Sequence, residues 1–90
     1  MMQYRGYKTI ILENLCYTEL VYERINKKLK THLSKAEIEK LIREIVKETD
    51  EITFIKKGKN IHITNHNRGI CLTVNSFTKK IITAVKTKKG

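Results

Sequence analysis

Two histidines and one arginine lie close together in the C-terminal part of the chain: His62, His66 and Arg68. An imidazole can move a proton near neutral pH, and a guanidinium can bind two phosphate oxygens at once. These three residues are therefore candidate catalytic residues for metal-independent cleavage of RNA. His62 would take the ribose 2′-hydroxyl proton, with His66 as the alternative proton carrier, and Arg68 would stabilise the developing charge. The competing interpretation is that the histidines are only solvated and that Arg68 only binds a phosphate backbone.

The net charge of +10 is unevenly distributed along the chain. Residues 1–51 contain ten basic and nine acidic residues, whereas residues 52–90 contain nine basic residues and no acidic one. A segment without carboxylates cannot neutralise its own cations, so we expect an anionic partner. This partner is either nucleic acid, with RNA favoured over DNA, or an acidic protein. The candidate nucleic-acid-binding residues are Lys56, Lys57, Lys59, Asn60, Arg68, Lys79 and Lys80.

Length and composition restrict the class of protein. Ninety residues predict a single domain over 1–90, in which residues 1–8 form a tail or an edge strand and residues 86–90 form a basic tail. No apolar run approaches the ~18 residues of a membrane span, and no signal-peptide pattern is present, so we expect a cytoplasmic protein without membrane contact. The two cysteines have no metal-ligand spacing, and no motif indicates a metal or a cofactor.

The N-terminal half has the periodicity of helices. Apolar residues recur at helical spacing over residues 9–33, with a break just before Thr18, which is a candidate N-cap. Ser34 and Glu37 have the spacing of a capping box, which predicts that the next helix begins at this serine. The intervening turn, residues 30–33, is short, so we expect an antiparallel helical hairpin.

After Asp50 the hydrophobic period changes to two, which predicts strands. We expect a four-stranded antiparallel meander with strands over residues 52–56, 61–64, 70–75 and 80–86. Gly58 is the residue expected at positive φ in the first turn. Helices that precede strands predict an α+β fold, in which the N-terminal helical hairpin packs on one face of the sheet.

Strand alternation assigns residues to the two faces of this sheet. The residues expected to face the helices are Ile61, Ile63, Ile70, Leu72 and Val74. The residues expected on the open face are Asn60, His62, Thr64, Cys71, Thr73 and Asn75. Basic residues of the turns would surround this polar face, an arrangement that suits a phosphate backbone. For the last strand, alternation does not decide which side chains face the helices. Aromatic residues are scarce after Tyr22, so base stacking is poorly provided for.

Three segments resemble a small bacterial family of uncharacterised function: YTELVYERINKKL at 17–29, KKGKNIHITN at 56–65 and TVNSFTKKIITAV at 73–85. The resemblance extends over roughly residues 14–85 and implies no activity. In topology, two helices followed by an antiparallel meander also look like the broad group of toxin ribonucleases that includes the RelE, barnase and colicin types. This looser resemblance implies metal-independent RNA cleavage on the sheet face. No motif matches residue by residue, so it assigns no catalytic residue.

These observations predict a small basic domain that binds nucleic acid, with a toxin-like ribonuclease as its enzymatic form. A non-enzymatic nucleic-acid-binding module is the first alternative. The second is a phage or mobile-element protein that inhibits a protein or nucleoprotein partner. RNA cleavage in EDTA, salt-dependent binding without cleavage, and equimolar binding of a protein partner would distinguish the three.

Overall fold

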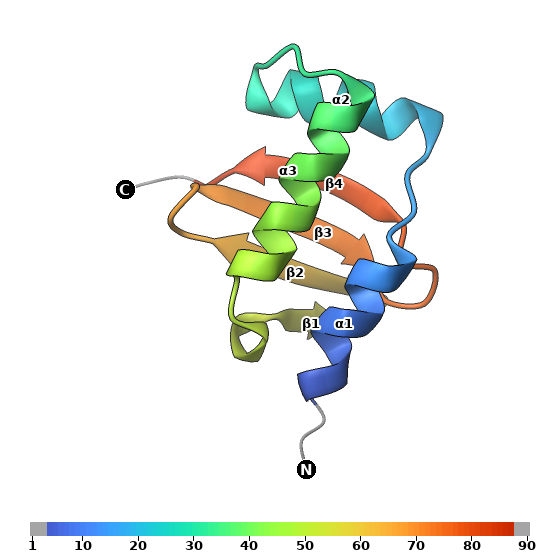
Figure 1. Cartoon of the computed structure of the whole chain (residues 1–90), viewed down its shortest axis with the longest axis vertical. Coiled ribbons are helices and arrows are strands. Elements are labelled where there is room, and N and C mark those ends of the chain that lie inside the picture. Colours follow the sequence, from blue (N-terminus) through green and yellow to red (C-terminus); the bar gives the residue numbers. More distant parts are fainter. Residues whose placement is uncertain (1–3, 88–90) are drawn as a thin grey trace.

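The computed structural model describes residues 4–87 and has three helices followed by a four-stranded antiparallel sheet (Figure 1). The helices are α1 (Tyr4–Asn14), α2 (Glu19–Leu29) and α3 (Lys35–Glu48), and a short 3-10 helix, η1, covers Glu51–Thr53. The strands are β1 (Ile55–Lys57), β2 (Asn60–Asn65), β3 (Ile70–Asn75) and β4 (Ile81–Lys86), in the spatial order β1-β2-β3-β4. The predicted α+β class is confirmed.

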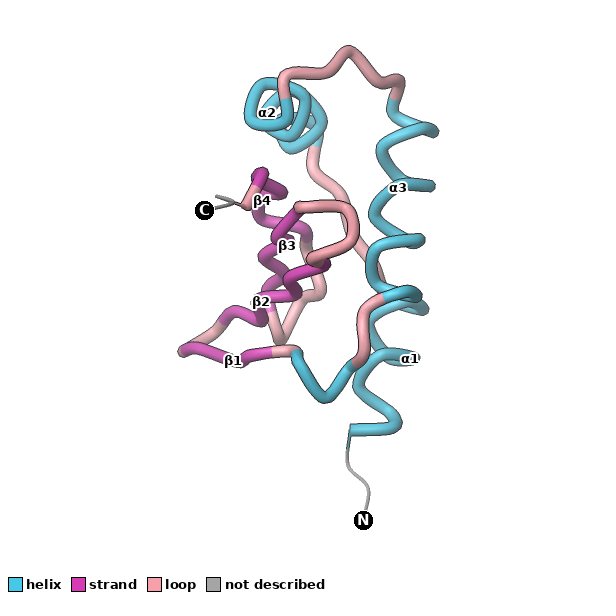
Figure 2. Tube along the Cα trace, turned by 90° about the vertical axis from the view of Figure 1, so that its left-hand side faces the viewer, coloured by secondary structure: helices cyan, strands magenta, loops and turns pink. Residues whose placement is uncertain are grey.

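Helices α1 and α3 lie on one side of the sheet, and α2 lies along its β4 edge, with the core between these helices and the strands (Figure 2). The inward residues of β2 and β3 are fully buried, as alternation predicts: Ile61, Ile63, Leu72 and Val74. They belong to one apolar cluster with the buried isoleucines of α3. The other face of the sheet is not covered by any helix of the described chain (Figure 2).

The N-terminal segment differs from the expectation. Residues 4–8 are not a tail or an edge strand, because they form the first part of α1. Ile11 of this helix is fully buried in the core, and α1 packs against α3 and η1. Tertiary packing therefore stabilises a helix whose first residues have no helical pattern. Residues 1–3 and 88–90 lie outside the described part, and Lys86 belongs to β4 rather than to a tail.

The turn between α2 and α3 is short, as expected, but α2 lies across the end of α3 instead of antiparallel beside it (Figures 1 and 2). Asn26 fixes this turn, because its Oδ1 accepts from Leu33 N at 2.9 Å and from Thr31 Oγ1 at 2.7 Å. Lys30 ends the helix in the left-handed conformation, at φ 60°. Because α2 does not lie along α3, it packs mainly against β4, the edge strand of the sheet.

The first strand begins later than the predicted residue 52, because the segment after α3 forms η1 instead. Asp50 caps this short helix, since its Oδ1 accepts from Ile52 N at 3.1 Å. Its carbonyl also accepts from Thr53 Oγ1 at 2.7 Å. Such local hydrogen bonds compete with strand pairing, and they leave Ile55 as the first residue of β1.

A bulge decides which residues of β4 face the helices. Thr73 pairs with Thr83, but the next residue, Val74, pairs with Ile81, so β4 has one extra residue at this point. Ile81 and Ala84 are consequently both buried, although a regular strand would place them on opposite faces. Alternation could not assign this strand because the alternation itself is interrupted.

The capping box of α3 generates a stability prediction. Ser34 Oγ accepts from Glu37 N at 3.1 Å, and the Glu37 carboxylate accepts from Ser34 N at 2.8 Å, which confirms the predicted start of the helix. Ser34→Ala removes one of these bonds and should cost about 0.5–2 kcal/mol of unfolding free energy. Thermal unfolding followed by circular dichroism should show a melting temperature lower by several degrees.

Thr18→Ala is the matched control. Thr18 occupies the N-cap position of α2, but its side chain makes no capping hydrogen bond. Its replacement should therefore leave the melting temperature close to that of the wild type. Equal losses in the two variants would mean that the capping box does not determine the stability of α3.

Candidate nucleic-acid interface

The meander brings the β1–β2 turn and the β3–β4 turn together at one end of the sheet. Ser76 N donates to Lys59 O at 2.7 Å, a hydrogen bond that joins the two turns. Asn60, the first residue of β2, pairs with Lys57 on one side and with Asn75 on the other. We name residues 56–60 and 75–80 the lysine end of the sheet. It contains all but one of the predicted nucleic-acid-binding residues: Lys56, Lys57, Lys59, Asn60, Lys79 and Lys80.

The lysine end has an uncompensated positive charge within the described residues. The salt bridges of the described residues involve Lys35 and Arg68, and none of them involves a lysine of the lysine end. Four of its five lysines are exposed: Lys56, Lys57, Lys59 and Lys80. Lys79 is half-buried, and its Nζ donates to Ser76 O at 2.6 Å, so its ammonium group holds the turn instead of facing solvent freely.

Both turns of the lysine end have defined backbone geometry. Gly58 lies at φ +60°, which confirms the conformation predicted for the first turn. Lys79 lies at φ +62°, a conformation that is uncommon for a residue other than glycine. Its N–H donates to Asn75 O at 2.9 Å, and this bond stabilises the unusual conformation. The exposed lysines are therefore attached to turns that the backbone holds in place.

Arg68 is separated from the other predicted binding residues. It lies in the β2–β3 turn, at the opposite end of the sheet, and its side chain reaches the C-terminal part of α3. Its Nε and Nη2 donate to Glu48 at 2.9 and 2.8 Å, and Nη2 also donates to Glu44 at 3.1 Å. Arg68 therefore does not lie beside His62, as a shared catalytic role of these two candidates would require. Residues 52–90 contain no Asp or Glu, but the fold brings the carboxylates of Glu44 and Glu48 from α3 to Arg68.

The two candidate histidines lie in different environments. His62 is half-buried on the open face, where its Nδ1 is 3.3 Å from Thr73 Oγ1. His66 is exposed in the β2–β3 turn, beside a hollow of about 170 Å³ whose lining includes Glu48 and Asp50. Arg68 is paired to α3 through Glu48, which also lines the hollow beside His66, whereas His62 lies on the open face beside Thr73. The structure does not assemble them into one site.

The rest of the open face has the predicted composition. Its residues are all half-buried: Asn60, His62, Thr64, Cys71, Thr73 and Asn75. Cys16 and Cys71 are free thiols. In the part of the chain that the structure describes, no three or more His, Cys, Asp or Glu side chains gather as a metal site. None of the described helices has the length and apolar character needed to cross a membrane.

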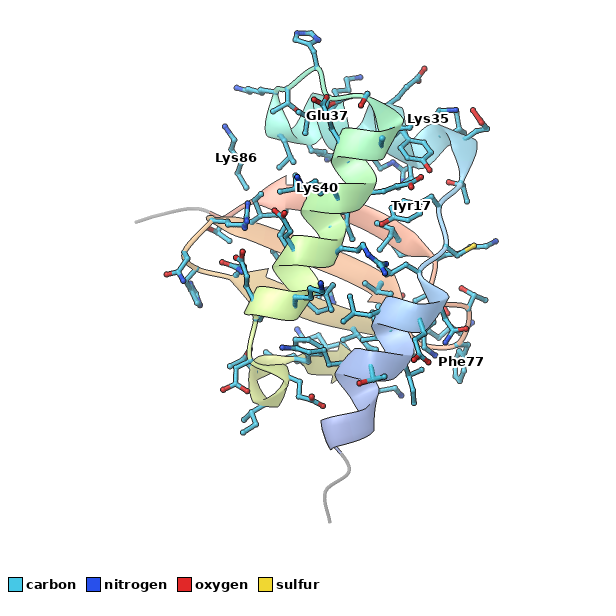
Figure 3. The ribbon with its side chains drawn as sticks, viewed as in Figure 1. Tyr17, Lys35, Glu37, Lys40, Phe77 and Lys86 are labelled. Atoms are coloured by element: carbon cyan, nitrogen blue, oxygen red, sulfur yellow. The ribbon has the colours of Figure 1, made fainter. Side chains whose placement is uncertain are left out.

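Sequence reasoning missed Phe77 at the lysine end. This residue is 71% exposed, whereas Phe54, the other phenylalanine, is buried in the core. Figure 3 shows Phe77 at one end of the sheet and Lys86 at the other. A signal was present, because Phe77 stands between Ser76 and Thr78 in a predicted turn, outside the apolar alternation of both neighbouring strands.

The ion pair of Arg68 generates a pH prediction. Hydrogen bonds from Arg68 lower the pKa of Glu48 below its ordinary value of 4.5. Because the folded-state pKa is lower than that of the unfolded chain, this pair stabilises the fold above about pH 4.5. The stabilisation is lost as the pH falls through the lowered pKa. Glu48→Gln should therefore lower the melting temperature at neutral pH and make its decline in acid smaller.

Glu23→Gln is the control for this measurement, because Glu23 is exposed on α2 and belongs to none of the ion pairs of the described residues. Melting temperatures measured from pH 7 to pH 3 should follow the wild-type curve in this variant. A Glu48→Gln curve parallel to that of the wild type would show that the ion pair does not stabilise the fold.

The comparisons with known proteins identify a family. A family model described as "Protein of unknown function (DUF3781)" matches residues 9–85, a range that contains α2, α3, the lysine end and all of the sheet except Lys86. Neither the comparison with curated proteins nor the comparison with solved structures gives a match. Because the family model covers most of the sequence, the chain belongs to the DUF3781 family.

Proposed function

We propose that this protein binds RNA, and that the lysine end of the sheet contacts the phosphate backbone. The observation that carries this proposal is the hydrogen bond from Ser76 N to Lys59 O, at 2.7 Å. It joins two turns whose exposed lysines have no salt bridge to a described carboxylate. Lysine clusters of this kind attract polyanions, because binding releases the counterions condensed on the phosphates.

The neighbouring polar groups support RNA as the ligand. Asn60 and Asn75 form a cross-strand pair between the two lysine turns. The Oδ1 of Asn75 accepts from backbone amides of its own turn, so the donor that this side chain can offer to a ligand is its amide nitrogen. Amide groups beside phosphate-binding lysines can bind the ribose 2′-hydroxyl, the group that distinguishes RNA from DNA.

The proposal is binding without cleavage. Metal-independent cleavage needs a base, an acid and a cation around one phosphate. His62 has Thr73 as its hydrogen-bonding neighbour, and Arg68 has its guanidinium on two carboxylates of α3. This arrangement favours a binding module over a ribonuclease. An inhibitor of an acidic protein remains the rival function, and it is an outcome of the experiment below.

The test is to neutralise Lys57, Lys59 and Lys80 together by substitution with glutamine. Binding of a fluorescent mixed-sequence RNA is measured by anisotropy between about 50 and 200 mM salt. At the low-salt end of this range, the triple variant should bind the RNA more weakly than the wild type does. The slope of log K against log salt should become smaller by about 2, since each lost phosphate contact removes about 0.7–0.9. The same samples, kept in EDTA and run on a gel, should contain intact RNA.

A variant with the same net charge is the control. Lys27, Lys28 and Lys40 are exposed on α2 and α3, and glutamine at these positions should leave the salt slope unchanged. An equal loss in both variants would overturn the assignment of the surface. A wild-type protein that ignores RNA at 50 mM salt, but binds an acidic protein through the same lysines, would overturn the proposed ligand in favour of the rival.

A further inference from the structure

Phe77 is an exposed apolar ring in the β3–β4 turn of the lysine end. It is 71% exposed and is not part of the buried core. A phenylalanine stabilises a fold by being buried, and most of this side chain is in contact with solvent. The chain contains only two phenylalanines and no tryptophan, and the other phenylalanine, Phe54, fills the core. The exposed position of Phe77 is therefore not explained by folding.

The turn that carries Phe77 is held by several hydrogen bonds. Asn75 Oδ1 accepts from Phe77 N at 2.8 Å and from Thr78 N at 2.9 Å. On the other side, Thr78 Oγ1 accepts from Lys80 N at 3.2 Å. The ring is thus attached to a backbone whose conformation is already set, and a ligand would not have to order it. Pre-organisation of this kind reduces the entropy lost on binding.

The charges around Phe77 identify the class of ligand. Ser76, the preceding residue, bonds to Lys59 of the neighbouring turn, and Lys80 follows three residues later. An aromatic ring between cations is the combination with which proteins bind single-stranded nucleic acids, since the cations follow the backbone and the ring stacks on a base. A duplex offers the same phosphates, but its bases are stacked on each other inside the helix.

We propose that the lysine end binds unpaired RNA, with one base stacked on the ring of Phe77 and the adjacent phosphates on Lys59 and Lys80. This inference rests on the proposed function and extends it, because it names the strandedness of the ligand and the residue that selects it. Stacking on a single ring requires no particular base, so the predicted binding tolerates many sequences.

The experiment uses Phe77→Trp, which introduces the only tryptophan of the chain. Its fluorescence therefore reports on this position alone. Titration with a single-stranded RNA should quench the indole, whereas a duplex of equal total charge should not. Quenching of the same depth by both ligands, or by neither, would overturn the stacking of a base on this residue.

Phe77→Ala tests the energetic contribution. Loss of one stacked base should weaken binding of single-stranded RNA by about 5- to 150-fold and leave duplex binding unchanged. The salt slope should not change, because no phosphate contact is removed. Ile52→Ala is the control, since Ile52 is 69% exposed in η1, which lies beside the β2–β3 turn at the opposite end of the sheet, and loss of its side chain should not alter RNA binding.

The two proposals fail in different ways. If the lysine substitutions weaken RNA binding but Phe77→Ala binds single strands as tightly as the wild type, the backbone contact stands and the stacking is refuted. If the lysine substitutions have no effect, the proposed function itself is refuted. Thermal unfolding of both Phe77 variants should match that of the wild type, because the ring lies outside the core.

Discussion

The rest of the structure depends on the burial of one face of the sheet beneath the helices. Ile61, Ile63, Leu72 and Val74 are fully buried there. Because side chains alternate along a strand, this burial sends the intervening amides, hydroxyls and imidazole to the opposite face. A chain of ninety residues forms one core of this kind, with α1 and α3 on a single side of the sheet (Figure 2). The polar face follows from the apolar one.

The same constraint separates the charges between the two ends of the sheet. In a meander, the first and third turns lie at one end, and the second turn lies at the other. The helix that covers the sheet, α3, finishes near the second turn, where buried Asn65 donates to Thr49 Oγ1 at 3.1 Å and accepts from Arg68 N at 2.9 Å. The carboxylate of Glu48 thereby meets Arg68. None of the salt bridges of the described residues reaches the first and third turns, so the positive charge of their lysines is not compensated there.

Local features of the sequence predicted most of this fold. The cap at Ser34, the glycine turn at position 58 and the alternation of β2 and β3 depend on neighbours in the chain, and all three are confirmed. Contacts between residues far apart in the chain could not be predicted from the sequence. For this reason the start of α1 and the pairing of Arg68 with Glu48, twenty residues away, were not predicted. The candidate site divides in the same way. The lysine cluster was predicted from composition, whereas the meeting of its two turns and the exposure of Phe77 required the fold.

The two kinds of cation also differ in what they can bind. Arg68 presents a planar fork, which suits the carboxylates of Glu44 and Glu48, so its guanidinium is engaged within the molecule. A lysine is a hydrated point charge on a flexible stem, which adapts to phosphates at variable positions. Such lysines fit a ligand that is recognised by its backbone. In the proposed complex, Phe77 would add a flat surface on which any base can stack. Together, these properties favour a binding surface that recognises the unpaired state of a strand rather than its sequence.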